Sequence, residues 1–138
     1  MTRITGRPRA LLEGKPRFGT LATTGADGAI HQVVVWFLLR GDTIVVNSRV
    51  GRAWPTNLLR DPRCNLLVED GYEWVSIGGS VETVTDQATA QADIAEMARR
   101  YQAHDPAEAE RIVREVFAPQ QRISFLLRPE RVIEHHDR

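Results

Sequence analysis

The stretch FGTLATTGADGAIHQVVVWF, residues 18–37, sets two β-forming runs on either side of Asp27-Gly28. An Asp-Gly pair between such runs is a strong signal for a tight hairpin. The second run continues as AIHQVVVWFLL (29–39), and after Arg40-Gly41-Asp42 the chain resumes with TIVVNS (43–48). We therefore predict three consecutive antiparallel strands joined by tight turns, arranged as a meander.

The following stretch, GRAWPTNLLRDPRC (51–64), interrupts this β pattern. Pro55 suits the first turn of a helix, where its missing N–H costs nothing. Leu58 and Leu59 could bury one side of such a helix, and the DPR segment (61–63) would end it. The stretch therefore predicts a helix of one to two turns.

Two more strands are predicted in CNLLVED (64–70) and EWVSIGGSVETVT (73–85), around a turn at Asp70-Gly71. Gly78-Gly79 inside the second of these indicates a bulge or a close approach of two backbones.

From Asp86 onward the apolar residues recur at helical spacing, as in Ile94, Met97 and Tyr101. Asp86 is a suitable N-cap, and His104-Asp105-Pro106 divides the segment into two helices. RISFLLRPERVIEHH (122–136) returns to β character, with Pro129 separating two strand-like pieces. The order of elements predicts a mainly β fold with helical insertions: a single domain, 1–138, forming an antiparallel barrel of about six strands.

Charge and composition exclude several classes of protein. Eighteen basic residues balance eighteen acidic ones, so no overall field attracts nucleic acid or an anionic membrane, and any anion site must be local. No apolar run has the length of a signal peptide or a membrane span, which predicts a cytoplasmic protein without a membrane partner. The single cysteine, Cys64, is expected to be an inert core residue.

The motifs of metal, dithiol and triphosphate chemistry are missing, because the chain contains no HExxH, CxxC or P-loop. His135 and His136 are adjacent and would point to opposite faces of a strand, so we predict no metal site. No serine stands in a GxSxG elbow. His31 alternates with Val33 and Val35, and this spacing favours a hydrogen-bonded histidine on an apolar face over a catalytic one.

One polar cluster remains, at the end of a predicted strand and the start of the predicted helix. It contains Asn47, Ser48, Arg49, Arg52 and Asn57, with Trp54 among them. Amide, hydroxyl and guanidinium donors near a helix N-terminus can bind a phosphate or a carboxylate. Arg52 and Asn57 could equally serve only to cap and solvate a turn.

A resemblance adds to this interpretation. The segment 18–37, NSRVGRAWPTNLLRDPRCNLLVED (47–70) and WVSIGGSVETV (74–84) resemble the pyridoxamine 5'-phosphate oxidase-like split-barrel family, and in particular its deazaflavin-dependent branch. The ordered set LAT, DG, VWF, NL and DPR carries the likeness, which extends more loosely over nearly the whole chain. The resemblance implies a homodimer of split β-barrels with two cofactor sites at the interface, each built from both chains.

The resemblance also implies which residues bind the cofactor, coenzyme F-420 or, alternatively, FMN. The strand around Val33–Phe37 would lie beside the ring system, and the segment 47–57 would enclose the phosphate. The cofactor-binding residues expected on this basis are Val33, Val34, Val35, Trp36, Asn47, Ser48, Arg52, Trp54 and Asn57.

Trp54 departs from the family pattern, because many relatives carry a lysine at this point of the motif. An indole can donate one neutral hydrogen bond in place of the lysine charge. Two interpretations stay open: Trp54 walls or stacks on the cofactor while Arg52 supplies the charge, or the site has drifted and binds something else.

The function expected from the resemblance is reduction of a small conjugated organic substrate by hydride from reduced coenzyme F-420. Trp74 is a candidate for the substrate-binding wall, and no catalytic side chain or proton donor can be identified. The alternatives are an FMN-dependent oxidoreductase of the same fold and a non-catalytic carrier of a flavin, a deazaflavin or haem.

Overall fold

The computed structural model describes residues 1–136. Seven strands and four helices follow one another in the described chain, and a single π-helical turn, η1, extends the last helix. The elements are α1 (Gly6–Glu13), β1 (Gly19–Thr24), β2 (Ile30–Val35), β3 (Leu38–Arg40), β4 (Thr43–Arg49), α2 (Ala53–Arg60), β5 (Arg63–Asp70), β6 (Glu73–Val84), α3 (Gln87–Tyr101), α4 (Pro106–Ile112), η1 (Val113–Phe117) and β7 (Arg122–His135).

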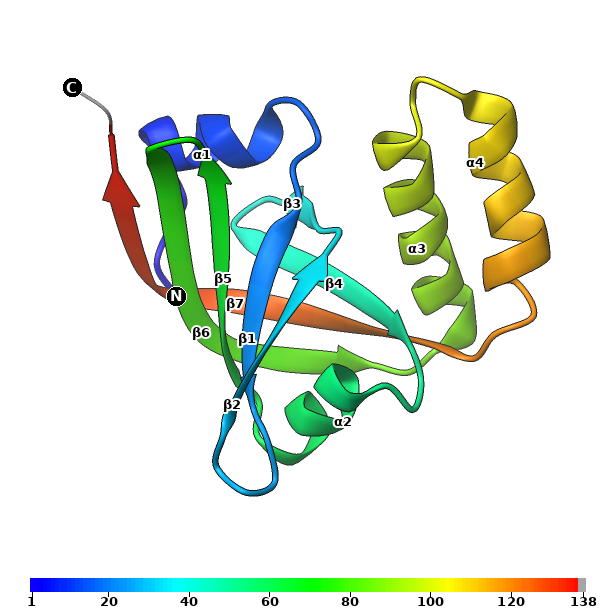
Figure 1. Cartoon of the computed structure of the whole chain (residues 1–138), viewed down its shortest axis with the longest axis horizontal. Helices are drawn as coiled ribbons and strands as arrows, with labels where there is room; N and C mark the ends of the chain where they lie inside the picture. The colour runs from blue at the N-terminus through cyan, green and yellow to red at the C-terminus, as the bar shows by residue number, and fades with distance from the viewer. Residues whose placement is uncertain (137–138) are drawn as a thin grey trace.

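All strands belong to one antiparallel sheet, in the order β2-β1-β5-β6-β7-β4-β3. The sheet curls strongly, so its two ends come round toward each other, with α2 below and α3 and α4 standing side by side beyond β4 (Figure 1). The predicted split antiparallel barrel is confirmed, with seven strands in place of about six.

The predicted meander is wrong. The run 29–39 divides at Trp36 and Phe37 into β2 and β3, which lie at opposite ends of the strand order. The backbone N–H of Phe37 donates to the Tyr101 hydroxyl (3.1 Å) instead of to a neighbouring strand, and the Phe37 ring is buried. A tertiary contact with α3 thus ends one strand where local β preference continues.

Pro129 does not divide the last strand. β7 runs unbroken past it, and Pro129 faces Gly79 where the β6–β7 register shifts between Gly78 and Gly79. A Cβ at Gly79 would lie 2.2 Å from the carbonyl oxygen of Arg128, so only glycine allows the two backbones to approach this closely. The predicted bulge at Gly78-Gly79 is confirmed.

The sequence predicts a hydrogen-bonded His31 on an apolar face, and the structure corrects this. It pairs with Thr23 near the tip of the β1–β2 hairpin and is exposed to solvent. The hairpin extends beyond the rest of the sheet (Figure 1), so the alternation that buries Val35 has no core to face at His31.

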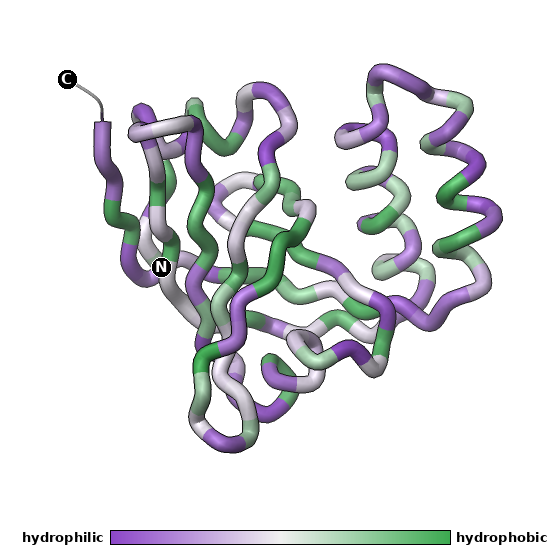
Figure 2. Tube along the Cα trace, viewed as in Figure 1, coloured by the Kyte–Doolittle hydropathy of each residue, from purple (hydrophilic) through white to green (hydrophobic). Residues whose placement is uncertain are grey.

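The main core fills the concave side of the sheet and includes Leu21, Ile44, Leu66, Ile77 and Phe125. Figure 2 shows the hydrophobic segments concentrated in the strands and hydrophilic residues at the turns. A second, smaller cluster joins Leu38, Val45, Ile94 and Met97 and attaches α3 to the sheet. The helix is therefore held rigidly against β4, and this determines what it can present to a site beside it.

The helix signals in the sequence are confirmed. Asp86 caps α3 by accepting from the Thr89 N–H (3.0 Å), and Asp105 caps α4. Pro55 lies in the first turn of α2, where Leu58 is buried and Leu59 is exposed.

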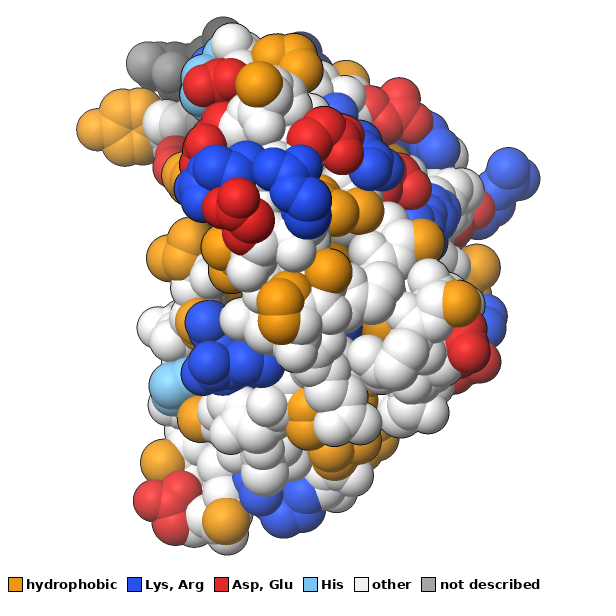
Figure 3. All heavy atoms as spheres, turned by 90° about the vertical axis from the view of Figure 1, so that its right-hand side faces the viewer, with side chains coloured by type: hydrophobic (Ala, Val, Ile, Leu, Met, Phe, Trp, Pro, Cys, Tyr) orange, Lys and Arg blue, Asp and Glu red, His pale blue; other side chains and the backbone are white. Residues whose placement is uncertain are grey.

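On the side that Figure 3 shows, acidic and basic side chains are interspersed and do not form one positive surface. No helix among residues 1–136 is both long enough and apolar enough to cross a bilayer.

Candidate functional site

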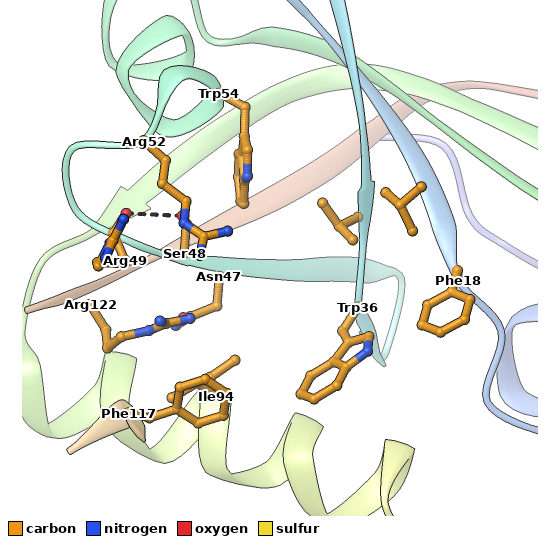
Figure 4. Close-up of a pocket in the computed structure, with 12 residues that line it drawn as sticks. Phe18, Trp36, Asn47, Ser48, Arg49, Arg52, Trp54, Ile94, Phe117 and Arg122 are labelled. Atoms are coloured by element: carbon orange, nitrogen blue, oxygen red, sulfur yellow. Dashed lines mark hydrogen bonds between the residues drawn. The ribbon is translucent and has the colours of Figure 1, made fainter. Parts of the chain in front are cut away.

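A hollow of about 260 Å³ opens between the curled sheet, the start of α2 and the side of α3. Figure 4 shows arginine side chains on one side of it and aromatic rings on the other, with Trp54 above and Phe117 below. The residues that line it are Phe18, Val34, Val35, Trp36, Asn47, Ser48, Arg49, Arg52, Trp54, Ile94, Phe117 and Arg122.

The aromatic side is built from rings of distant segments. Trp36 stacks on Tyr101 of α3, with ring centroids 5.0 Å apart and planes 11° from parallel, and Phe18 stacks on the same tyrosine at 6.1 Å. The Tyr101 hydroxyl donates to the Arg17 carbonyl (2.7 Å), and burial raises the pKa of this phenol. Tyr101 is thereby a fixed support for Trp36, which forms a flat apolar wall.

The opposite side gathers three guanidinium groups. Arg49 ends β4 and is the cross-strand partner of Arg122, the first residue of β7, while Arg52 immediately precedes α2. Gly51, with a φ of 100°, allows the sharp turn that brings Arg52 back toward the strand. Within residues 1–136 no carboxylate forms an ion pair with any of the three.

Arg122 is the most buried of these arginines, at 5% exposure. Burial, and after it the charges of Arg52 and Arg49, lowers the pKa of Arg122 to about 10, so the group stays positive at neutral pH. Three like charges in one small hollow repel one another. An anion bound among them would offset the free-energy cost of this repulsion and of removing the guanidinium groups from water. The electrostatics of the site therefore favour an anionic ligand.

Trp54 belongs to the core as well as to the hollow. Its ring lies 5.9 Å from that of Phe125, and only 5% of the residue is exposed. The Trp54 indole N–H donates no hydrogen bond within residues 1–136, so this donor is free, and Trp54 lines the hollow. Trp54 is thus a rigid wall with one polar atom to offer.

The two polar residues at the end of β4 are already engaged. The Asn47 amide donates to the Ala90 carbonyl and to Ser124 Oγ, both at 2.9 Å, and its oxygen accepts from Arg122 Nε (3.0 Å). Ser48 Oγ donates to the Arg49 carbonyl (2.9 Å). Asn47 therefore acts on the hollow through Arg122.

The structure brings most of the predicted site residues together. Those that line the hollow are Val34, Val35, Trp36, Asn47, Ser48, Arg52 and Trp54. Val33 is half buried and packs against the core. Asn57 points inward from α2, where its amide donates to Thr23 Oγ1 (3.1 Å) and its oxygen accepts from Arg60.

Trp74, predicted in the substrate wall, does not line the hollow. It stacks on His135 with ring centroids 5.7 Å apart, in a separate apolar groove that also contains Leu67 and Ile133. The groove lies on the outer face of β5, β6 and β7. The structure therefore does not place Trp74 beside the arginines.

Sequence reasoning missed Phe18, Ile94, Phe117 and Arg122, and it left Arg49 in the polar cluster without a role. Arg122 enters the site only because β7 pairs with β4, a contact across 73 positions of the chain. No local motif marks it. The sequence did contain one indication of a role for Arg122. It directly precedes the mainly apolar run ISFLL (123–127), and a charged residue beside such a run needs a polar partner or a ligand.

The other candidate groups have ordinary surroundings. Cys64 is buried in the core, and this burial raises the pKa of its thiol to about 12, as expected for an inert cysteine. His136 contacts Glu134, and His135 stacks on Trp74. No set of three or more His, Cys, Asp or Glu side chains in the described range is grouped to hold a metal ion.

The fold is shared with many solved structures. An F-420 reductase has a TM-score of 0.72 at 24% identity, covering 91% of this chain and 94% of that one. A conserved hypothetical protein from Mycobacterium tuberculosis has a TM-score of 0.77 at 24% identity, covering 96% and 85%. The heme storage protein of Vibrio cholerae has a TM-score of 0.67 at 15% identity, covering 96% and 94%.

No curated protein matches this sequence. A family described as pyridoxamine 5'-phosphate oxidase does match, over residues 4–136, which include every strand of the sheet and every residue that lines the hollow. The family is one of flavin and deazaflavin oxidoreductases on this fold, and the chain belongs to it.

Proposed function

We propose that this protein is an oxidoreductase that binds coenzyme F-420 in the hollow described above and uses it to reduce a small conjugated organic substrate. The observation that carries the proposal is the composition of the hollow: three arginines that form no ion pair within residues 1–136 stand at one end, and a flat aromatic wall stands at the other. A phosphate-bearing ring cofactor needs both features, at opposite ends of its length.

The arginine end fits a phosphate group. Arg122 uses Nε and one terminal nitrogen for Asn47 and for Gln120 Oε1 (2.6 Å), and its remaining nitrogen has no partner among residues 1–136. Arg52 is exposed and can move toward a ligand. Together they provide charged donors in the fork geometry that phosphate oxygens accept.

The aromatic end fits a ring system. Val34 and Trp36 present apolar surface to the hollow, and the stacking of Trp36 on Tyr101 fixes its orientation. These residues would hold the ring in place and exclude water from one of its faces. Reduced coenzyme F-420, when bound, supplies the hydride.

Coenzyme F-420 is preferred to FMN because of the resemblance of the LAT, DG, VWF, NL and DPR segments to the deazaflavin-dependent branch. The F-420 reductase among the similar structures is consistent with this choice. Haem is not favoured, because none of the described residues that line the hollow is a histidine, cysteine or methionine that could be an axial ligand for iron.

The proposal includes a homodimer. Cross-strand pairing places Val34, Leu67 and Ile133 in one row on the outer face of the sheet, and all three are exposed, at 65%, 38% and 48%. Such a row is typical of a protein interface. Since Val34 also lines the hollow, a second copy packed on this row would border the cofactor and close a hollow that is slightly below the usual volume of about 300–1,000 Å³ for ligand sites.

Titration of the purified protein with coenzyme F-420, FMN and riboflavin tests the proposal. We expect the tightest binding for coenzyme F-420, and riboflavin, which lacks the phosphate, to bind more weakly than FMN. Quinone, nitro and enone acceptors are then added to the reduced complex. Binding without reduction of any acceptor would identify a carrier, and no binding of any of the three would refute the proposal.

A further inference from the structure

A buried row of side chains links Arg122 to the carboxylate of Asp93 on α3. Arg122 Nε lies 3.0 Å from Asn47 Oδ1, Asn47 Nδ2 lies 2.9 Å from Ser124 Oγ, and Ser124 Oγ lies 2.7 Å from Asp93 Oδ2. All four residues are at least nine-tenths buried. Figure 4 shows the Asn47 end of this row between β4 and the guanidinium of Arg122.

Every hydrogen bond in this row has a forced direction. A guanidinium can only donate and an ionised carboxylate can only accept. Arg122 therefore donates to the Asn47 oxygen, the Asn47 amide donates to Ser124, and the Ser124 hydroxyl must donate to Asp93. Aligned donors polarise one another, so the row holds Arg122 in a single orientation.

Helix α3 supplies the fixed end of the row and also anchors the Arg122 backbone. Gln87 accepts from the Arg122 N–H (2.9 Å) and donates to the Arg122 carbonyl (2.8 Å). Ala90, one turn further along, accepts from the Asn47 amide. Because α3 is packed on β4, one rigid helix holds both the backbone and the side chain of Arg122 in place.

The charges in the row are separated. Asp93 Oδ1 forms an ion pair with Arg40 at 2.8 Å, so its negative charge is already compensated by a side chain that does not line the hollow. Two neutral side chains, Asn47 and Ser124, stand between this carboxylate and Arg122. The row thus supports Arg122 by hydrogen bonds while leaving its positive charge available in the hollow.

We propose that Asn47, Ser124 and Asp93 are positioning residues that hold Arg122 ready to bind a phosphate group, free or esterified. A direct Asp–Arg pair in this place would orient the guanidinium equally well but would neutralise it. The proposal rests on the proposed function only for the identity of the cofactor that carries the phosphate.

The test is a double-mutant cycle that compares wild type, Ser124→Ala, Arg122→Gln and the double variant. Tryptophan fluorescence measures the affinity of each protein for inorganic phosphate. We expect Ser124→Ala to weaken phosphate binding about five- to tenfold, the scale of one hydrogen bond to a charged group. In the Arg122→Gln background the same change should alter affinity less than about twofold, because Ser124 acts through Arg122.

Thr23→Val is the matched control, since it removes a buried hydroxyl that also accepts from an asparagine amide, away from the hollow. It should destabilise folding to a similar extent and leave phosphate affinity unchanged. Riboflavin affinity distinguishes positioning from general damage: Ser124→Ala should lower the affinity for FMN and spare that for riboflavin. Equal losses for both ligands, additive effects in the cycle, or a wild type that does not bind phosphate would each overturn the proposal.

Failure of the proposed function gives a different pattern. A wild type that binds inorganic phosphate through Arg122 but binds neither coenzyme F-420 nor FMN would refute the cofactor assignment and leave the positioning role standing. Equal affinity of wild type and Ser124→Ala for the cofactors would refute the positioning role alone.

Discussion

The hollow around Arg122 and the groove around Trp74 are formed by the same sheet, and they differ in what stands behind them. The hollow has α3 on one side, and helix side chains orient its polar groups. The groove, of about 380 Å³, is a bare outer surface of β5, β6 and β7 lined by Leu67, Glu69, Trp74, Ser76 and Ile133. A supported polar hollow suits a small charged ligand, whereas an unsupported apolar surface suits another protein surface.

The largest expected effect concerns the groove. Leu67→Asp places a carboxylate in the apolar row, and burying it unpaired in a dimer interface costs about 3 kcal/mol, so the dimer dissociation constant should rise at least about a hundredfold. Sedimentation velocity at several concentrations measures this. Leu59→Asp, on the exposed side of α2, is the matched control and should leave the dimer intact. An unchanged dimer in Leu67→Asp would remove the groove from the interface.

The next effect concerns the hollow. Arg122→Gln removes a buried charged donor, and FMN or coenzyme F-420 should bind more weakly by about 2–3 kcal/mol. Riboflavin should lose less than about 0.5 kcal/mol, since it has no phosphate to contact. Fluorescence titration provides both values. A parallel loss for riboflavin would mean that Arg122 supports the shape of the hollow rather than the anion.

Trp54→Lys tests the departure from the family pattern. The indole packs against Phe125 and walls the hollow, so the lysine loses apolar contact, and cofactor affinity should fall by about 1–3 kcal/mol despite the added charge. Binding should be measured at low and high salt, well below the melting temperature of the variant. Stronger binding that weakens steeply with salt would instead show that the ammonium occupies a working phosphate contact.

Arg52→Ala should have a smaller effect than Arg122→Gln. Arg52 is exposed, and water screens its charge, so we expect a loss of about 1–2 kcal/mol in the affinity for the phosphate-bearing cofactor. The loss should shrink as salt is added. Were Arg52→Ala to cost more than Arg122→Gln, the phosphate would lie at the mouth of the hollow and not beside β7.

The smallest effect is expected for Trp74→Ala. The groove is separate from the hollow, and distant sites contribute nearly independently, so cofactor affinity should stay within about 0.5 kcal/mol of wild type at concentrations where the dimer persists. Isothermal titration calorimetry can resolve this. A loss of substrate turnover with cofactor affinity intact would support a place for Trp74 in the substrate wall.

Much of this protein follows from its sequence, because the signals are local. The Asp27-Gly28 hairpin, the caps at Asp86 and Asp105 and the Gly78-Gly79 bulge each depend on the conformational preferences of a few adjacent residues. Such preferences act within one turn of helix or one hairpin. The polar cluster from Asn47 to Asn57 is predictable for the same reason, since its members are neighbours in the chain.

The tertiary structure decided what no neighbouring residue can specify. It divided the run 29–39 between the two ends of the sheet, turned Asn57 inward and set Trp74 on a different surface from the hollow. It also brought Arg122 beside Arg49 across 73 positions and anchored it to α3. Strand pairing and helix packing balance burial against hydrogen bonding over the whole chain, so the position of Arg122 in the hollow is a property of the fold and not of any segment.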